Sequence, residues 1–244
     1  MQRLRIRYAK RGRLRFSSHR DFQRALERAL RRAAVPMAYS AGFSPHPKVS
    51  YANAAPTGTA SEAEYVEIGV AERCDPDRLR AALDASLPPG LDVVEVVEAG
   101  PGSLAERLEA SHWSVRLPSL TLAEAERAVG LLLAAEAVTV ERVMKDGKRA
   151  LDARAPLLAA RVDADPEDGC AILDMVVRHV TPAVRPDDVV TALRVVADLV
   201  PAAPGPWIWA ATRLAQGPLQ PDGTVGDPLD PDRAAVGATA PGPV

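Results

Sequence analysis

The sequence predicts an α+β protein of two tandem ferredoxin-like (split βαβ) units with a disordered C-terminal tail. Over residues 1–101 the expected elements run strand, helix, strand, strand, helix, strand, which is the ferredoxin-like order. A similar order with an extra hairpin recurs over residues 102–215. Hydrophobic periodicity is lost after that, which indicates a tail over residues 216–244. Apolar residues make up 47% of the chain, which is enough for a packed core.

The first strand and helix are the most clearly marked elements. Leu4, Ile6 and Tyr8 alternate with arginines over residues 3–9, which is the period of a strand with one buried face. Ser18, with an acid three residues later, marks the start of a helix. The buried stripe of that helix is expected to consist of Phe22, Leu26, Ala29, Leu30 and Ala33, before Pro36 ends it.

Further strands and helices complete both units. In the first unit we expect strands at residues 48–52, 64–70 and 91–99, and a helix opening at Asp75-Pro76. In the second unit we expect strands at residues 113–117, 139–144, 149–156, 159–162, 171–177 and 207–214, with helices at residues 121–136 and 188–200. The two units share no detectable residue-level similarity, so the duplication rests on element order alone.

The tail is predicted to be disordered from its composition. Six prolines and five glycines fall within residues 216–244, and no apolar periodicity survives there. Four aspartates against one arginine make the segment weakly acidic. Its charge is therefore opposite in sign to that of the N-terminal region.

Positive charge is concentrated at the start of the chain. Residues 1–50 hold thirteen Lys or Arg against two acids, a balance of +11, whereas the rest of the chain carries −13. The overall charge of −2 is therefore a cancellation of two opposed regions. A concentrated cationic face is typical of proteins that bind a polyanion.

The first helix has a basic side. Arg20, Arg24, Arg28 and Arg31 are spaced by four or three residues, so they form one continuous stripe. One interpretation is a solvated arginine face. The other is a phosphate-binding stripe, because the planar guanidinium can contact a phosphate through two donors. The strand and turn before the helix add Arg11, Arg13 and Arg15 to the same region.

Two histidines and one proline-rich loop are the other candidates. His19 sits at the helix N-terminus, where it could be a general base, a phosphate donor or a structural residue. His46 lies between Pro45 and Pro47, which predicts a rigid loop. This loop is either a stiff turn or a recognition loop, in which Phe43 or His46 stacks on a base and Lys48 lies near a phosphate.

Other features of the chain narrow the function. Lys145 and Lys148 flank a glycine turn and could extend the basic surface into the second unit. The four histidines are not spaced as zinc ligands, and we expect neither a metal nor a cofactor. Cys74 and Cys170 are expected to be reduced, as in a cytoplasmic protein. No signal peptide or membrane span is expected.

Several motifs together resemble the radical SAM-linked protein family. They are Ser18-His19-Arg20-Asp21 with Arg24, Glu27 and Arg28, the string at residues 38–48, Ser61-Glu62-Ala63-Glu64-Tyr65, Lys145-Asp146-Gly147-Lys148, Asp152-Ala153-Arg154 and Arg185-Pro186-Asp187. The resemblance covers residues 1–214, and Gly-Phe-Ser-Pro-His-Pro-Lys at residues 42–48 is its most specific part. The family is a domain of unknown function, often attached to the C-terminus of a radical SAM protein. This chain has no CxxxCxxC triplet, so the resemblance implies a stand-alone version whose partner enzyme is separate or absent.

The sequence therefore predicts an RNA-binding accessory or targeting module, linked to RNA modification or processing, with tRNA or rRNA as the RNA. The doubled ferredoxin-like order is also similar to that of RNA-processing endonucleases of CRISPR systems, an analogy at the level of fold. An enzyme is the less favoured interpretation, in the form of a metal-independent RNA-processing enzyme that uses His19 or His46. A third interpretation is a protein-interaction domain that partners a radical SAM enzyme. The expected nucleic-acid contacts are Arg11, Arg13, Arg15, Arg20, Arg24, Arg28, Arg31, His46, Lys48, Lys145 and Lys148.

Overall fold

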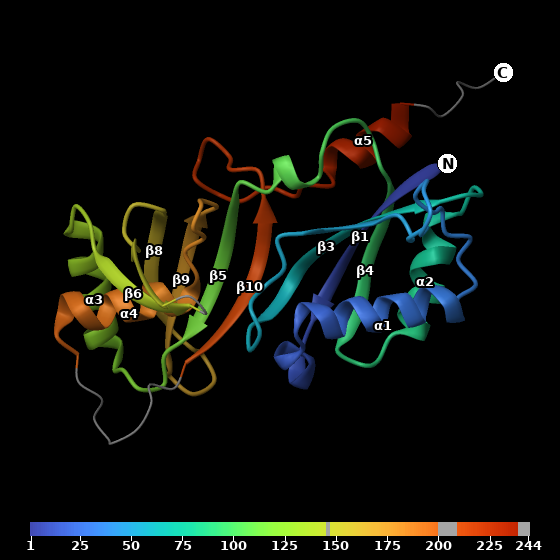
Figure 1. The fold of residues 1–244 in the computed structure, drawn as a ribbon. Helices are drawn as coiled ribbons and strands as arrows, with labels where there is room; N and C mark the ends of the chain where they lie inside the picture. Colours follow the sequence, from blue (N-terminus) through green and yellow to red (C-terminus); the bar gives the residue numbers. More distant parts are fainter. Residues whose placement is uncertain (145–146, 200–208, 239–244) are drawn as a thin grey trace. The chain divides into compact units, whose positions relative to one another are not determined.

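The computed structural model describes residues 1–144, 147–199 and 209–238 of the chain. In this described part the protein is mixed α+β, with antiparallel strand pairs and five α-helices. The chain divides into two compact units (Figure 1). Unit 1 comprises residues 1–108 and the segment from Asp227 onward, and unit 2 comprises residues 109–226.

Unit 1 contains a four-stranded antiparallel arrangement with two helices on one face (Figure 1). Its elements are β1 (Gln2–Lys10), η1 (Gly12–Phe16), α1 (His19–Arg32), β2 (Val49–Ala52), β3 (Ala60–Val70), α2 (Pro76–Ser86), β4 (Leu91–Glu98) and η2 (Ala105–Arg107). β1 lies between β3 and β4, and β2 pairs with β3. The predicted alternation is confirmed, because Leu4, Ile6 and Tyr8 are buried against α1 and α2.

The start of α1 follows the predicted capping box. The hydroxyl of Ser18 accepts a hydrogen bond from the backbone N–H of Asp21 at 3.2 Å. The carboxylate of Asp21 accepts in return from the backbone N–H of Ser18 at 3.1 Å. These bonds satisfy N–H groups that have no partner inside the helix. The ring of Phe22 then stacks on Tyr8 with centroids 4.0 Å apart, which fixes α1 to β1.

Unit 2 contains a second antiparallel arrangement with an additional hairpin. Its elements are β5 (Ala110–Arg116), α3 (Leu122–Ala134), β6 (Thr139–Met144), β7 (Gly147–Asp152), β8 (Leu157–Ala164), β9 (Ala171–Arg178), α4 (Pro186–Ala197) and β10 (Ala210–Gly217). β5 lies between β10 and β9, β8 pairs with β9, and β6 pairs only with β7 among the described strands. Trp113, Leu132, Leu173 and Leu193 are among its buried core residues.

The face of the unit 1 sheet opposite the apolar core carries a buried charge network. Arg5 lies on β1, and its side chain has 0% exposed area. Its Nη1 donates to both carboxylate oxygens of Asp232, at 2.7 and 2.9 Å. Its Nε donates to Glu67 on β3 at 2.9 Å, and its Nη2 donates to the carbonyl oxygen of Gly102 at 2.6 Å. Every nitrogen of the buried guanidinium group therefore has a partner.

The partner carboxylate of Asp232 is equally well satisfied. It accepts a hydrogen bond from Arg107 at 2.9 Å and one from the backbone N–H of Gly100 at 2.8 Å. A Cβ atom at position 100 would come 3.0 Å from Oδ1 of Asp232, which is tighter than ordinary contact. Glycine at this position therefore permits the close approach of the carboxylate.

The C-terminal segment that contains Asp232 was predicted to be disordered, and this prediction was wrong for residues 216–238. α5 (Asp230–Ala238) packs near β4, and Leu229 is buried (Figure 1). Arg233 also pairs with Glu95 of β4 at 2.5 Å. Composition suggested disorder because this segment has no apolar periodicity of its own, but its order comes from ion pairs with strands distant in sequence. Residues 239–244 lie outside the described residues.

We expect Asp232→Asn to destabilise the protein by about 3 kcal/mol or more, because it removes one partner of a buried ion pair. The matched control is Asp230→Asn in the same helix, which breaks the solvent-exposed pair with Arg233. That change should cost about 1 kcal/mol or less. Urea denaturation followed by circular dichroism measures both free energies of unfolding. Equal losses for the two variants would contradict the buried network.

The stability supplied by Asp232 should depend on pH. Burial alone would raise the pKa of this carboxyl, but the hydrogen bonds from Arg5 and Arg107 outweigh it and lower the pKa below its ordinary value. A lowered carboxyl pKa adds stability that is complete above the unfolded-state pKa of about 3.9 and is lost as the pH falls through the folded-state pKa. The difference in unfolding free energy between the wild type and Asp232→Asn should therefore shrink below about pH 4. A difference that stays constant from neutral pH to pH 3 would refute this.

Candidate nucleic-acid interface

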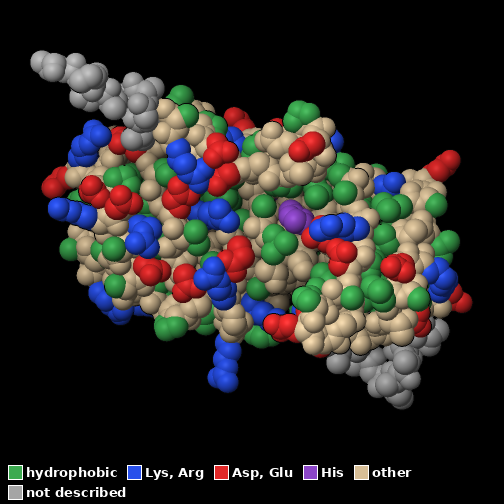
Figure 2. All heavy atoms as spheres, turned by 180° about the vertical axis from the view of Figure 1, so that it is seen from behind, with side chains coloured by type: hydrophobic (Ala, Val, Ile, Leu, Met, Phe, Trp, Pro, Cys, Tyr) green, Lys and Arg blue, Asp and Glu red, His purple; other side chains and the backbone are tan. Residues whose placement is uncertain are grey.

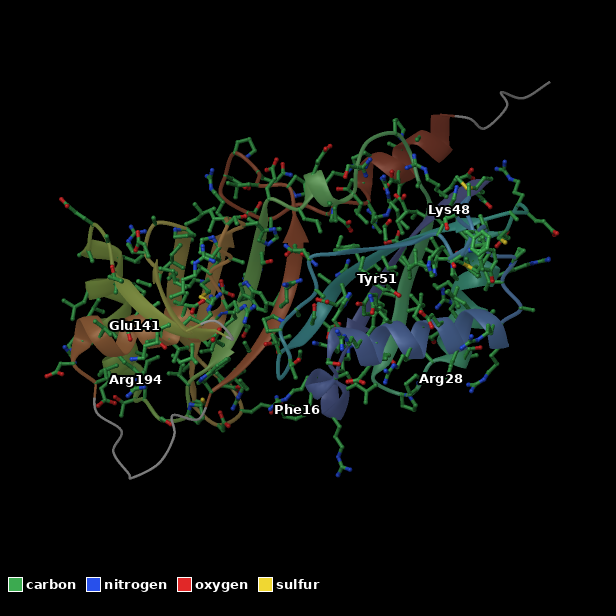
Figure 3. The ribbon with its side chains drawn as sticks, in the orientation of Figure 1. Phe16, Arg28, Lys48, Tyr51, Glu141 and Arg194 are labelled. Atoms are coloured by element: carbon green, nitrogen blue, oxygen red, sulfur yellow. The ribbon has the colours of Figure 1, made fainter. Side chains whose placement is uncertain are left out.

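The outward side of α1 carries four arginines that are exposed to solvent. Arg20, Arg24, Arg28 and Arg31 follow the predicted stripe, while Phe22 and the other apolar residues of the helix face the core. In the part of the chain that the structure describes, none of the four forms an ion pair with a carboxylate. Figure 3 labels Arg28 on α1. Four like charges held at one- to three-turn spacings therefore face solvent without a direct ion pair.

The arginines of β1 do not belong to this exposed set. Arg3 pairs with Glu67, and Arg7 lies 3.7 Å from Asp227. Lys10 is buried and donates to the carbonyl oxygens of residues 55 and 56. Seen from behind, basic and acidic side chains are interspersed over the surface (Figure 2). The N-terminal positive charges are thus of two kinds: those of β1 have partners on the sheet, and the four exposed arginines of α1 form no ion pair in the described structure.

The predicted contacts outside α1 have separate surroundings. Arg11 pairs with both Glu62 and Asp92, and these hydrogen bonds, which outweigh its desolvation, raise its pKa. Arg13 is exposed on η1, and Arg15 lies over the ring of Phe16 at 4.8 Å.

The predicted lysine contacts differ in their surroundings. Lys48 is exposed, with its Nζ 3.3 Å from the sulfur of Met1, and Figure 3 shows it apart from Arg28. Lys148 is paired with Glu141 at 2.9 Å, and Lys145 lies outside the described residues.

The proline-rich segment forms a closed loop between α1 and β2. Tyr39 and Pro47 form an antiparallel bridge. The backbone N–H of Ser40 donates to the carbonyl oxygen of His46 at 2.8 Å, and the backbone N–H of His46 donates to the hydroxyl of Ser40 at 3.0 Å. The prediction of a non-helical loop is confirmed. Phe43 is fully exposed at the loop tip, although aromatic rings are usually at least partly covered.

A groove of about 390 Å³ lies between this loop and α1. Glu27, Leu30 and Arg31 come from the helix side. The loop side and its approach supply Val35, Met37, Tyr39, His46 and Pro47. Two of the predicted contact residues, Arg31 and His46, therefore line the same groove.

His19 lies in a different environment from His46. Its Nε2 is 3.0 Å from the side-chain nitrogen of Gln23, and its ring meets the edge of Tyr51 at 4.9 Å. Burial, and then the charge of Glu27, raise the pKa of Tyr51 to about 12, so this phenol stays protonated at neutral pH. No carboxylate forms an ion pair with His19 or His46 among the described residues. Neither histidine thus has the acidic partner that orients a general base in a catalytic triad.

Among the polar residues that line the groove, sequence reasoning missed two as contacts, Glu27 and Tyr39. Glu27 is one of only two acids in residues 1–50, and the other, Asp21, is used in the capping box. An acid left inside an arginine stripe was a signal that could have indicated a specific role. Tyr39 gave no such signal, because its exposure depends on how the loop folds back on itself.

The structure also limits other kinds of site. Across residues 1–144, 147–199 and 209–238, no three His, Cys, Asp or Glu side chains gather as a metal-binding group. Cys74 and Cys170 are both half-buried and form no disulfide. No helix in the described ranges combines the length and apolar character needed to cross a membrane.

The likeness of this chain to two similar solved structures is weak. DypB from Rhodococcus jostii RHA1 is 14% identical, with 79% of this chain and 83% of that chain covered and a TM-score of 0.21. The encapsulated DyP-type peroxidase from Mycobacterium smegmatis is 10% identical, with 88% and 90% covered and a TM-score of 0.19. TM-scores this low support no argument about shared fold or function.

Comparison with protein families gives a clear result. No curated protein matches the chain. A family model does match, over residues 3–186, which is most of the chain and includes both the α1 stripe and the groove. The protein therefore belongs to the bacterial family described as "uncharacterized protein conserved in bacteria (DUF2344)".

Proposed function

We propose that this protein binds RNA through the outward side of α1 and the adjoining loop, as an accessory or targeting module for RNA modification or processing. The observation that carries the proposal is the exposed set Arg20, Arg24, Arg28 and Arg31, which form no ion pair among the described residues. It lies beside a groove that contains Tyr39 and His46. Phosphates would be bound by the arginines, and bases would stack on the exposed rings.

Charge alone would fit any polyanion, including an acidic protein. The loop favours RNA, because a fully exposed Phe43 and a half-exposed Tyr39 offer ring faces to unpaired bases. An acidic peptide has fewer planar groups that could stack on these rings. Single-stranded or looped tRNA or rRNA segments combine phosphates and accessible bases, so they match both features of the surface.

The partner and the fold type are further parts of the proposal. The resemblance of residues 1–214 to radical SAM-linked proteins supports a cytoplasmic role beside a separate radical SAM or RNA-processing enzyme. We also class both units as ferredoxin-like. In each unit the first strand lies between the third and the fourth, in the orders β4-β1-β3-β2 and β10-β5-β9-β8. The hairpin β6–β7 would then be an insertion between α3 and β8.

We expect the double variant Arg24→Ala/Arg28→Ala to bind tRNA and rRNA fragments more weakly. Alanine keeps the helix, because its helix propensity is high. The slope of log affinity against log salt should fall by about 1.4, or about 0.7 for each lost contact to a single strand. The matched control is Arg73→Ala/Arg161→Ala, which removes the same charge from exposed arginines that are paired with carboxylates. Filter binding over a salt series measures both.

The RNA proposal would fail in either of two cases. The first is equal weak binding to tRNA, rRNA and a polyacidic protein. The second is equal loss of affinity in the test and control variants.

We expect His46→Ala to weaken RNA binding and His19→Ala to leave it within about twofold, because only His46 lines the groove. Neither change should affect RNA integrity, since the proposed module is not a nuclease. The measurement is gel analysis of the same RNAs after incubation, alongside binding. RNA cleavage by the wild type that is lost in either variant, with binding retained, would instead establish the enzyme interpretation.

A further inference from the structure

The groove between α1 and the loop has the size and lining of a site for a small planar group. Its volume of about 390 Å³ lies within the range of about 300–1,000 Å³ that is usual for ligand pockets. Leu30, Val35 and Met37 give it apolar walls. The rings of Tyr39 and His46 lie at its loop side, where they could contact the face of a bound base.

Glu27 is the residue that phosphate binding does not explain. It lies at helical spacing from Arg24 and Arg31, and it lines the groove together with Arg31. It forms no ion pair within the described part of the chain. A carboxylate repels phosphate, so on a surface that binds only the RNA backbone it would weaken binding. A carboxylate is, however, a strong acceptor for N–H donors on a base edge.

The geometry of the acceptor selects one base. A carboxylate has two oxygens and can accept two parallel hydrogen bonds. Guanine presents two adjacent donors, N1–H and the N2 amino group, on its Watson–Crick edge. Adenine, cytosine and uracil each present a single donor next to an acceptor. An acceptor facing an acceptor leaves a lone pair unsatisfied, which costs affinity.

We propose that this groove binds one unstacked guanine base of single-stranded RNA, with Glu27 accepting from N1–H and N2–H₂ and the Tyr39 and His46 rings against the base. Arg31 then contacts the phosphate next to that base. The ligand is a strand rather than a free nucleotide, because Arg28, Arg24 and Arg20 continue along α1 and can contact further phosphates. This inference rests on the proposed RNA binding and adds base specificity to it.

The test uses fluorescence anisotropy with short single-stranded oligouridines that carry one central guanosine, inosine, adenosine or cytidine. The wild type should bind the guanosine probe at least about fivefold tighter than the all-uridine strand. A ratio of about fivefold is the smallest discrimination expected from one bidentate contact to a base. Inosine keeps N1–H but lacks the N2 amino group, so its affinity should be lower than that of guanosine. This comparison requires no change to the protein.

The variant Glu27→Gln should bind the all-uridine strand at least as tightly as the wild type, because one negative charge is removed, but its preference for guanosine should disappear. The matched control is Glu72→Gln, an exposed glutamate of the same unit that is outside the groove. It removes the same charge and should keep the preference. Glu27 is exposed on α1, so the variant is expected to fold, which circular dichroism checks.

The results separate this inference from the function on which it rests. Salt-dependent binding that needs Arg24 and Arg28 but is equal for all bases would overturn the guanine site and leave RNA binding intact. A preference for guanosine that survives in Glu27→Gln would also overturn it. If free guanosine monophosphate competes at the same concentration as the strand, the inference that the ligand is an RNA strand rather than a free nucleotide would be overturned. Absence of binding to every RNA would overturn the proposed function itself.

Discussion

The buried ion pair between Arg5 and Asp232 joins the two ends of the described chain and organises unit 1. A guanidinium group without exposed area is costly unless each of its donors is satisfied. Here the partners come from β3, from the turn at Gly102 and from α5, so these segments have to be in place together. Unit 1 is therefore discontinuous in sequence, and its C-terminal segment is part of the fold rather than an appendage.

This network also decides which of the N-terminal charges are available to a partner. The arginines of β1 point away from the apolar core and meet Glu67, Asp227 and Asp232. The acidic character of the C-terminal segment thus has a structural use, because it neutralises the sheet face. The arginines of α1 have no such partners in the described structure. The net charge of residues 1–50 therefore overstates the positive potential at the surface, because part of that charge is paired. The positive potential is concentrated at the exposed arginines of α1.

In the proposed function, the loop and α1 combine two kinds of recognition. Arginine side chains on a rigid helix supply attraction to phosphates that does not depend on sequence. The groove beside them offers apolar walls, exposed rings and one carboxylate, which are groups suited to a base. The loop is closed by the bonds between Ser40 and His46, and α1 is fixed by the stacking of Phe22 on Tyr8, so both walls are held before a ligand arrives. Such preorganisation reduces the entropy lost on binding.

The sequence by itself determined the local elements. The alternation at Leu4, Ile6 and Tyr8 specified β1, the pair Ser18 and Asp21 specified the start of α1, and the spacing of the arginines specified the exposed stripe. These features depend on periods of two and 3.6 residues, which are local properties of the backbone. The tertiary structure alone decided that Arg5 is buried by Asp232, that α5 is ordered, and that Glu27 and His46 share a groove. Each of these features depends on contacts between residues that are far apart in the sequence or on different elements. Such contacts produce no periodic pattern in the sequence, so they could not be predicted from it.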